Sequence, residues 1–330
     1  MKTIEDPEML RRDLSPLFSG TYRSQRLFPH THPGQASWVW SVDTTEGERI
    51  VRTSRFSIPP DEDFWQGAKR LFDVDSSQVR RMVTVHRRLE PLSSIPLPKI
   101  FDVKTLGENT YLILEKLPGY ALSSFMELPV PALTKLGEAL GSIHSCRYSS
   151  FGSPLLMEKI TPPFVDNHAL FRFHARMVET MQYLVDTFYA DDLQVRPYWT
   201  NFLDQSSHLL PLDYASPIML DMDPTQFLAD GAAITGLVDT ELYALGPRQL
   251  ELIGLEYLLD EDRAQMFRLG YERIMPLPIL APYRSAYRLL LRLMSFQGAV
   301  DWTTWMNAPI RFIDHPPSPV SQTEERVGTV

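Results

Sequence analysis

The hydrophobic period of this chain changes near Pro118 and Gly119, and that change limits the folds open to it. Before it, short stretches alternate apolar and polar residues, which is typical of half-buried strands. After it, apolar residues recur every three or four positions, as on one face of a helix. We therefore expect an α+β protein with a β-rich lobe over residues 1–117, a larger, mainly helical lobe over 118–315 and a flexible tail over 316–330.

The first lobe carries the alternation of a sheet. Trp38, Trp40 and Val42 lie on one face of a predicted strand, and Ile50 and Arg52 fall two apart on the next strand after a polar break. The remaining segments expected in this lobe are an earlier strand at 26–28, a hairpin of 100–103 with 111–114, and a helix over 76–89. The sequence thus predicts a five-stranded sheet with one main helix.

Helical spacing dominates the second half. The expected helices cover 133–143, 170–184, 248–258, 263–273 and 284–298. An exception interrupts them, because 217–221 and 234–239 have the composition of short strands around a turn at Asp230 and Gly231. We expect the residues that carry out the chemistry of the protein to lie in this segment.

Acidic residues recur at that exception with a defined spacing. The run IMLDMDPTQFLADGAAITGLVDTELYALGPRQLEL (218–252) carries Asp221, Pro224, Asp239, Glu241 and Gly246. A single Asp is common in turns, but this set at this spacing resembles the H-G-D-x-x-P-x-N and D-W-E motifs of the aminoglycoside phosphotransferase and choline kinase-like family. The resemblance implies a bilobal, protein-kinase-like fold and the transfer of phosphate from ATP to a hydroxyl of a small molecule.

The resemblance also implies roles within this run. Asp221 takes the position of the catalytic carboxylate, which orients the acceptor hydroxyl and receives its proton. Gln226 and Asp239 take the positions of the magnesium ligands. Asp223 is an additional acid that either binds the metal or faces solvent. The family carboxylates that brace the segment correspond to Glu241 and Glu251.

In the first lobe, the resemblance implies a nucleotide site. Gly34 and Ser37 belong to a loop similar to the one that covers the phosphates of ATP. Arg52 lies where the family places a cation on the third strand. Glu115 and Leu117 flank a segment that looks like the hinge, whose backbone holds adenine. ATP and Mg²⁺ are therefore the expected cofactors.

The active-site run departs from the family motif at three positions. Met219 replaces the His two residues before the catalytic carboxylate, and Leu220 replaces the Gly between them, so that packing takes over from a hydrogen-bonding brace. Gln226 replaces an Asn, which keeps a carbonyl ligand but adds a rotatable bond.

The helix at 76–89 departs as well, because it contains no acid to pair with Arg52. Either another carboxylate, such as one from 61–63, replaces that partner or the nucleotide site is dismantled. Two functions consequently stay open: an ATP- and magnesium-dependent phosphotransferase acting on a metabolite or antibiotic-like compound, and a kinase-fold protein repurposed for ligand binding or other chemistry.

Composition and net charge limit the classes of partner that this protein is expected to bind. The formal net charge of -9 argues against nucleic acid, whose phosphates demand clustered Lys and Arg. No stretch approaches the roughly 18 apolar residues of a membrane span, the N-terminus lacks the apolar core of a secretory signal, and Cys146 is the single cysteine. We expect a cytoplasmic protein with a small-molecule acceptor.

Several other side chains allow two interpretations. His144 continues an apolar helix face, which favours a core histidine. Four aromatic residues either line an acceptor pocket or belong to the core, the latter being commoner at such spacings: Tyr283, Tyr287, Trp302 and Trp305.

Overall fold

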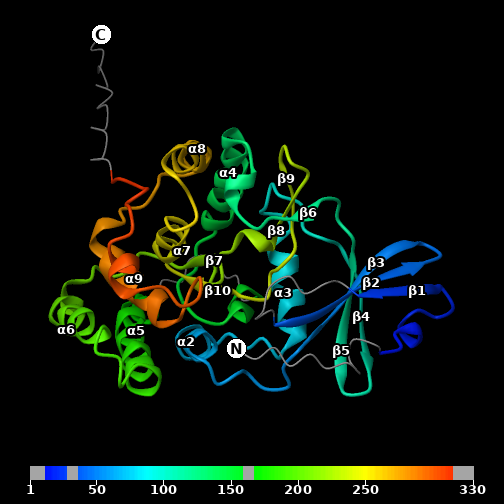
Figure 1. Ribbon diagram of the computed structural model, residues 1–330, viewed down its shortest axis with the longest axis horizontal. Coiled ribbons are helices and arrows are strands. Elements are labelled where there is room, and N and C mark those ends of the chain that lie inside the picture. The colour runs from blue at the N-terminus through cyan, green and yellow to red at the C-terminus, as the bar shows by residue number, and fades with distance from the viewer. Residues whose placement is uncertain (1–11, 28–35, 159–166, 315–330) are drawn as a thin grey trace, which may run out of the picture.

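The structure, a computed structural model, describes residues 12–27, 36–158 and 167–314. The expected tail at 316–330 lies outside these residues. The five-stranded antiparallel sheet of the first lobe has the order β1-β2-β3-β5-β4 and lies at one end of the molecule (Figure 1). Its strands are β1 (Tyr22–Leu27), β2 (Ser37–Thr44), β3 (Gly47–Ser54), β4 (Ile100–Leu106) and β5 (Asn109–Glu115). The predicted sheet is confirmed, although β1 begins earlier than expected.

The alternation read from the sequence determines which face of the sheet is buried. Trp38, Trp40 and Val42 are all buried in one cluster with Tyr111. The opposite face receives α3 (Val79–Leu89), whose Met82 packs in a separate cluster with two residues of β5. The predicted helix thus exists, but it begins at Val79 rather than at residue 76.

A second helix of this lobe was not predicted. The helix α2 (Asp63–Phe72) buries Trp65, Ala68 and Leu71 at helical spacing, and it ends at Asp73 in a left-handed conformation with φ of 53°. It packs mainly against α5 (Asn167–Phe188) of the helical lobe (Figure 1). The expectation of one main helix was therefore incomplete, because a second helix joins the first lobe to the second.

The helical lobe has the elements that the sequence predicts, together with two short helices that it did not. Besides α5, its helices are α4 (Leu133–His144), α6 (Val195–Gln205), α7 (Arg248–Leu255), α8 (Glu261–Glu272), α9 (Ala281–Leu293) and α10 (Trp302–Met306). The helix predicted over 284–298 is wrong at its end, since α9 stops at Leu293 and an irregular segment follows. Within the described residues, no helix is long and apolar enough to span a membrane.

The helices α4 and α8 touch at the level of their backbones. A Cβ atom added to Gly137 would lie 2.0 Å from the carbonyl oxygen of Phe267, and one added to Gly270 would lie 1.9 Å from that of Thr134. Any side chain at either position would force the helices apart. This contact fixes α4, and with it His144, against the rest of the lobe.

Short strands place the acidic segment between the lobes. The strand β7 (Ser216–Met219) pairs with β10 (Tyr243–Gly246), whereas β8 (Phe227–Ala229) pairs with β6 (Tyr120–Ala121) and with β9 (Ile234–Leu237). The turn at Asp230 and Gly231 therefore joins β8 to β9, and the predicted strand at 217–221 finds its partner in β10 instead. Asp221 follows β7 directly, and the loop 238–242 follows β9.

Candidate active site

Asp221 lies in the turn between β7 and a 3₁₀ turn formed by Pro224–Gln226. Asp223 caps that turn, because its Oδ1 accepts hydrogen bonds from the backbone N of Thr225 at 2.8 Å and from its hydroxyl at 2.6 Å. The Gln226 side-chain amide donates to Asp221 Oδ2 at 3.4 Å. The local hydrogen bonds thus hold Asp221 and Gln226 side by side.

The environment of Asp221 disfavours its charge. Burial, the neighbouring carboxylate of Asp223 and that of Asp239 together raise the pKa of Asp221 from 3.8 to about 7. A carboxyl group with such a pKa exchanges its proton readily at neutral pH, as a general base must. Of the acids in this loop, Asp221 is therefore the one suited to accept a proton.

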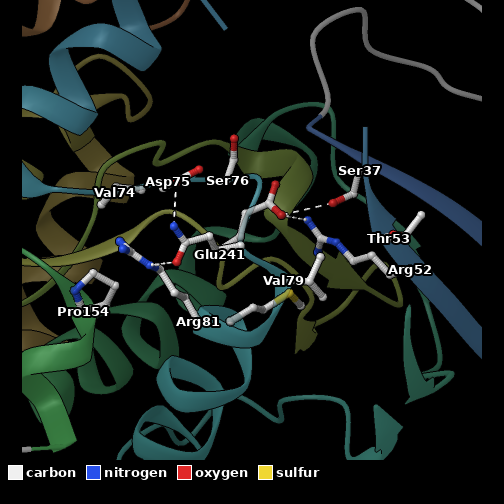
Figure 2. A pocket seen from close by; sticks show the side chains of 12 residues that line it. Ser37, Arg52, Thr53, Val74, Asp75, Ser76, Val79, Arg81, Pro154 and Glu241 are labelled. Atoms are coloured by element: carbon white, nitrogen blue, oxygen red, sulfur yellow. Dashed lines mark hydrogen bonds and ion pairs between the residues drawn. The ribbon is translucent and has the colours of Figure 1, made fainter. Parts of the chain in front are cut away.

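Arg52 pairs with acids from the helical lobe. Its Nη2 lies 3.0 Å from each carboxylate oxygen of Asp239 and 2.9 Å from Glu241 Oε2. Ser37 donates to the same Glu241 oxygen at 3.1 Å. Figure 2 shows Ser37, Arg52 and Glu241 converging, and this group with Asp239 is called the cleft cluster below.

Other carboxylates, Asp239 and Glu241, thus take the place of the missing helix acid, as one of the two alternatives expected. The example suggested from 61–63 is wrong for Asp63, which has other partners. Asp63 accepts hydrogen bonds from Tyr189 at 2.7 Å and from Ser295 at 2.5 Å, in the helical lobe. The only signal in the sequence for the partners of Arg52 was that two acids, Asp239 and Glu241, lie two residues apart in one loop. Their pairing with Arg52, which lies 187 positions before Asp239, required the fold.

Burial and charge act in opposite directions in the cleft cluster. Burial disfavours the charge of Arg52, but Asp239 and Glu241 outweigh it and raise the pKa of the guanidinium. Burial raises the pKa of Glu241 to about 7, and the attraction of Arg52 only partly opposes it. Arg52 therefore keeps its charge, while Glu241 can take up a proton near neutral pH.

The residues expected to bind nucleotide lie on both sides of the interlobe segment. Ser37 and Arg52 belong to the cleft cluster. Glu115 accepts a hydrogen bond from the backbone N of Lys99 at 3.1 Å, and Leu117 lies against Gly236 at the start of the connection between the lobes. Gly34 lies outside the described residues. The structure thus places four of the five around one interlobe region, and their roles stay predictions.

The acids do not form a metal site as they are arranged. Both oxygens of Asp239 face Arg52, and Asp223 is occupied by Thr225 and by Gln297 Nε2 at 3.2 Å. Across residues 12–27, 36–158 and 167–314, no group of three or more His, Cys, Asp or Glu side chains could hold a metal ion. The expected ligands Gln226, Asp239 and Asp223 therefore do not fit Mg²⁺ in this arrangement.

A cleft lies beside the cluster on the side of α3. It contains about 360 Å³ of empty space, part of it open to solvent. Arg52, Arg81, Asp75 and Glu241 supply its charged walls, and Met82 supplies part of its apolar wall (Figure 2). The helix α3 forms part of the wall of this cleft but contributes no acid to it.

A second buried group of polar residues supports the helical lobe. His144 Nε2 lies 2.6 Å from Glu251 Oε2, and its Nδ1 lies 3.0 Å from the hydroxyl of Tyr271, which also accepts a hydrogen bond from Arg248. These four residues are called the lobe cluster below. His144 is fully buried, in agreement with its predicted core role.

The four aromatic residues that could have lined an acceptor pocket are core residues. Tyr287 is fully buried, and the exposed fractions of Tyr283, Trp302 and Trp305 are 6%, 2% and 2%. Trp305 stacks on Tyr257 with ring centroids 3.8 Å apart. The more ordinary interpretation of these side chains was the correct one.

Solved structures share this arrangement of lobes. A macrolide 2'-phosphotransferase from Brachybacterium faecium aligns with a TM-score of 0.57 at 12% identity, over 92% of this chain and 98% of that one. The chain has the bilobal, kinase-like fold of the antibiotic phosphotransferases.

Two further structures of this kind agree. Wild-type aminoglycoside 2'-phosphotransferase-IIIa, in a GDP complex, aligns with a TM-score of 0.57 at 13% identity over 90% of each chain. A thermostable mutant of aminoglycoside phosphotransferase APH(4)-Ia, in a ternary complex with AMP-PNP and hygromycin B, aligns with a TM-score of 0.56 at 14% identity, over 88% of this chain and 92% of that one. No protein-family model and no curated protein matches the sequence. At these identities the likeness concerns the fold.

Proposed function

We propose that the protein transfers a phosphoryl group from a nucleoside triphosphate to a hydroxyl of a small molecule, with Asp221 as the general base. The observation that carries the proposal is the position of Asp221 at the end of β7, between the lobes, with a pKa raised to about 7. The proposal is supported by solved phosphotransferases of the same fold that contain ADP, GDP or AMP-PNP.

The proposed step uses residues that lie between the lobes as follows. The acceptor oxygen forms a bond to the γ-phosphorus, and the bond from that phosphorus to the bridging oxygen breaks. The acceptor proton moves to Asp221, and the nucleoside diphosphate leaves with the electron pair. Gln226 keeps the Asp221 carboxyl oriented through its 3.4 Å hydrogen bond. Arg52 supplies positive charge at the side of the cleft where phosphate oxygens carry negative charge.

A second function rests on the cleft cluster. Arg52 occupies both oxygens of Asp239, the residue expected to bind Mg²⁺. If this pairing is permanent, the cleft binds a small ligand without a magnesium nucleotide. This is the repurposed kinase fold that the departures in the sequence also leave open.

A melting titration separates these two functions. The first function predicts that ATP with Mg²⁺ raises the melting temperature of the protein, because a ligand that binds only the folded state stabilises it. It also predicts ATP consumption in the presence of one or more members of a panel of hydroxylated antibiotics and metabolites. An unchanged melting temperature together with no ATP consumption would favour the second function.

Asp230 offers a matched control for Asp221. It lies exposed in the β8–β9 turn, where its Oδ1 accepts hydrogen bonds from the backbone N of Ala232 and Ala233, both at 2.9 Å. The change Asp230→Asn removes the same charge outside the interlobe region. Phosphate transfer should therefore survive Asp230→Asn and be lost in Asp221→Asn.

A further inference from the structure

The segment that follows α9, residues 294–298, has an unusual backbone. Ser295 and Gln297 have φ of 51° and 61°, and Gly298 has φ of 79°. The amide of Ser295 donates to the Arg292 carbonyl, and that of Phe296 to the Leu291 carbonyl, which is the pattern of a helix end with a left-handed residue. Glycine is usual at such positions, because other residues pay a steric cost there. Ser295 and Gln297 adopt this conformation in spite of that cost.

The side chains of this segment reach the two regions on which the candidate site depends. Ser295 donates to Asp63 of α2 at 2.5 Å and lies 3.2 Å from the Tyr189 hydroxyl. Gln297 Nε2 donates to the Met222 carbonyl and to Asp223 Oδ2, both at 3.2 Å. The segment therefore connects α2 to the loop that carries Asp221.

The apolar side chains of the segment lie behind the same loop. Met294 and Phe296 line an apolar pocket together with Met219, Leu220 and Met222. Glycines in two helices allow this approach, since a Cβ atom on Gly67 of α2 would lie 2.7 Å from Met294 Cγ and one on Gly254 of α7 would lie 3.4 Å from Phe296. The segment thus lies between α2 and α7, and it lines one pocket with Leu220 and Met222, the residues on either side of Asp221.

We propose that Gln297 is a positioning residue for Asp221, which it acts upon through Met222 and Asp223. The proposal rests on the proposed phosphotransferase function for its catalytic consequence. Gln297 donates hydrogen bonds to the carbonyl of Met222, one residue after Asp221, and to the carboxylate of Asp223, two residues after it. The left-handed backbone of the segment aims the Gln297 amide at these two acceptors, and the packing of Met294 and Phe296 keeps the segment in place.

Three substitutions at this position separate positioning from a general structural role. Gln297→Gly suits the left-handed backbone and removes the donor, Gln297→Asn tolerates that backbone but is one methylene too short, and Gln297→Lys keeps a donor of sufficient length. The full chain is used in each case. The readouts are hydrogen exchange of the amides at 222–226, the denaturant midpoint, and kcat and KM for phosphate transfer.

Gln297→Gly should speed exchange at 222–226 by about fivefold or more, because one hydrogen bond contributes about that factor and two are lost, with an unchanged midpoint. The kcat should fall by a similar factor of about five, with little change in the KM for nucleotide. Gln297→Asn should behave like Gln297→Gly, and Gln297→Lys should restore most of the wild-type values. Unchanged exchange at 222–226, or faster exchange throughout the protein, would overturn the proposal. If the wild-type protein transfers no phosphate, the proposed function fails, but the exchange experiment still decides whether Gln297 holds the loop.

Discussion

The cleft cluster and the lobe cluster each pair a glutamate with a basic residue, and the two glutamates are ten residues apart. In the lobe cluster, the side chains of His144 and Glu251 are 0% and 1% exposed. In the cleft cluster, Asp239 keeps 25% of its side chain exposed beside a buried Arg52. The lobe cluster can contribute only to the fold, whereas the cleft cluster leaves an acid accessible to a ligand. Substitutions in the two regions should therefore have different effects.

The largest effect is expected beside the cleft cluster, at Asp221. Asp221→Asn should lower kcat/KM for phosphate transfer by about 10³-fold, because general-base catalysis contributes factors of about 10² to 10⁴. Steady-state kinetics with an accepted substrate measure this loss. A variant that retains more than about a tenth of the activity would show that Asp221 is no base.

The next effect concerns the lobe cluster. Glu251→Ala should lower the free energy of unfolding by about 3 kcal/mol, because it leaves His144 without its 2.6 Å partner in a fully buried site. Urea unfolding measures the change. The melting shift produced by ATP should be the same as in the wild type, and a lost shift would mean that the two clusters are not functionally separate.

A smaller loss of stability is expected from the corresponding change in the cleft cluster. Arg52→Met should cost about 2 kcal/mol, because Asp239 and Glu241 lose their cation but regain some contact with water. Adding Glu241→Gln should recover part of this loss, and a double-mutant cycle in urea measures the recovery. Full additivity of the two changes would contradict the pairing seen here.

The pH dependence of stability offers a third contrast. Since the pKa of Asp221 is raised from 3.8 to about 7 in the folded protein, the folded state binds its proton more tightly than the unfolded state between these values. The contribution of this group is therefore present at low pH and is lost as the pH rises through 7. Asp221→Asn should be more stable than the wild type by up to about 4 kcal/mol at pH 8 and nearly equal to it at pH 4.

The control for this contrast is Asp230→Asn. Backbone hydrogen bonds lower the pKa of Asp230, so its replacement should give no gain in stability on going to pH 8. Equal gains in the two variants would show that the net charge of the protein, and not the environment of Asp221, causes the effect.

The smallest effect is expected at the edge of the cleft cluster. Ser37→Ala removes the 3.1 Å hydrogen bond to Glu241 and should cost about 1 kcal/mol or less. It should also raise the pKa of Glu241, because the hydroxyl favours the carboxylate. Urea unfolding and a pH titration of the Glu241 carboxyl carbon by NMR measure the two changes.

The parts of the fold that follow local periodicity were predictable. The strand that contains Trp38, Trp40 and Val42 could be predicted because all three side chains lie on the same buried face. The helix α2 was missed although Trp65, Ala68 and Leu71 carry the same kind of signal. The end of α9 was missed for a different reason. Ser295 and Gln297 adopt left-handed conformations there, and such conformations are expected from the sequence only where the residue is glycine.

Of the candidate site, only the acidic residues could be predicted from the sequence. The spacing of Asp221, Asp239 and Glu241 singled out the segment, and the structure brings all three to the interlobe region. The pairing of Arg52 with Asp239 and the reach of Gln297 to Asp223 join residues far apart in the chain. The first contact depends on how the two lobes meet and the second on how distant segments of the helical lobe pack, and no local pattern specifies either.

The position of α2 has a consequence for how the chain can be divided. A fragment that stopped at residue 117 would contain the entire sheet, but it would expose Trp65, Leu71 and Phe72, which are buried in the largest core cluster of the protein. A fragment that began at 118 would lack the helix that packs on α5. The two halves should accordingly be insoluble when they are expressed apart and should recover a folded protein only when they are expressed together, in the manner of a split reporter.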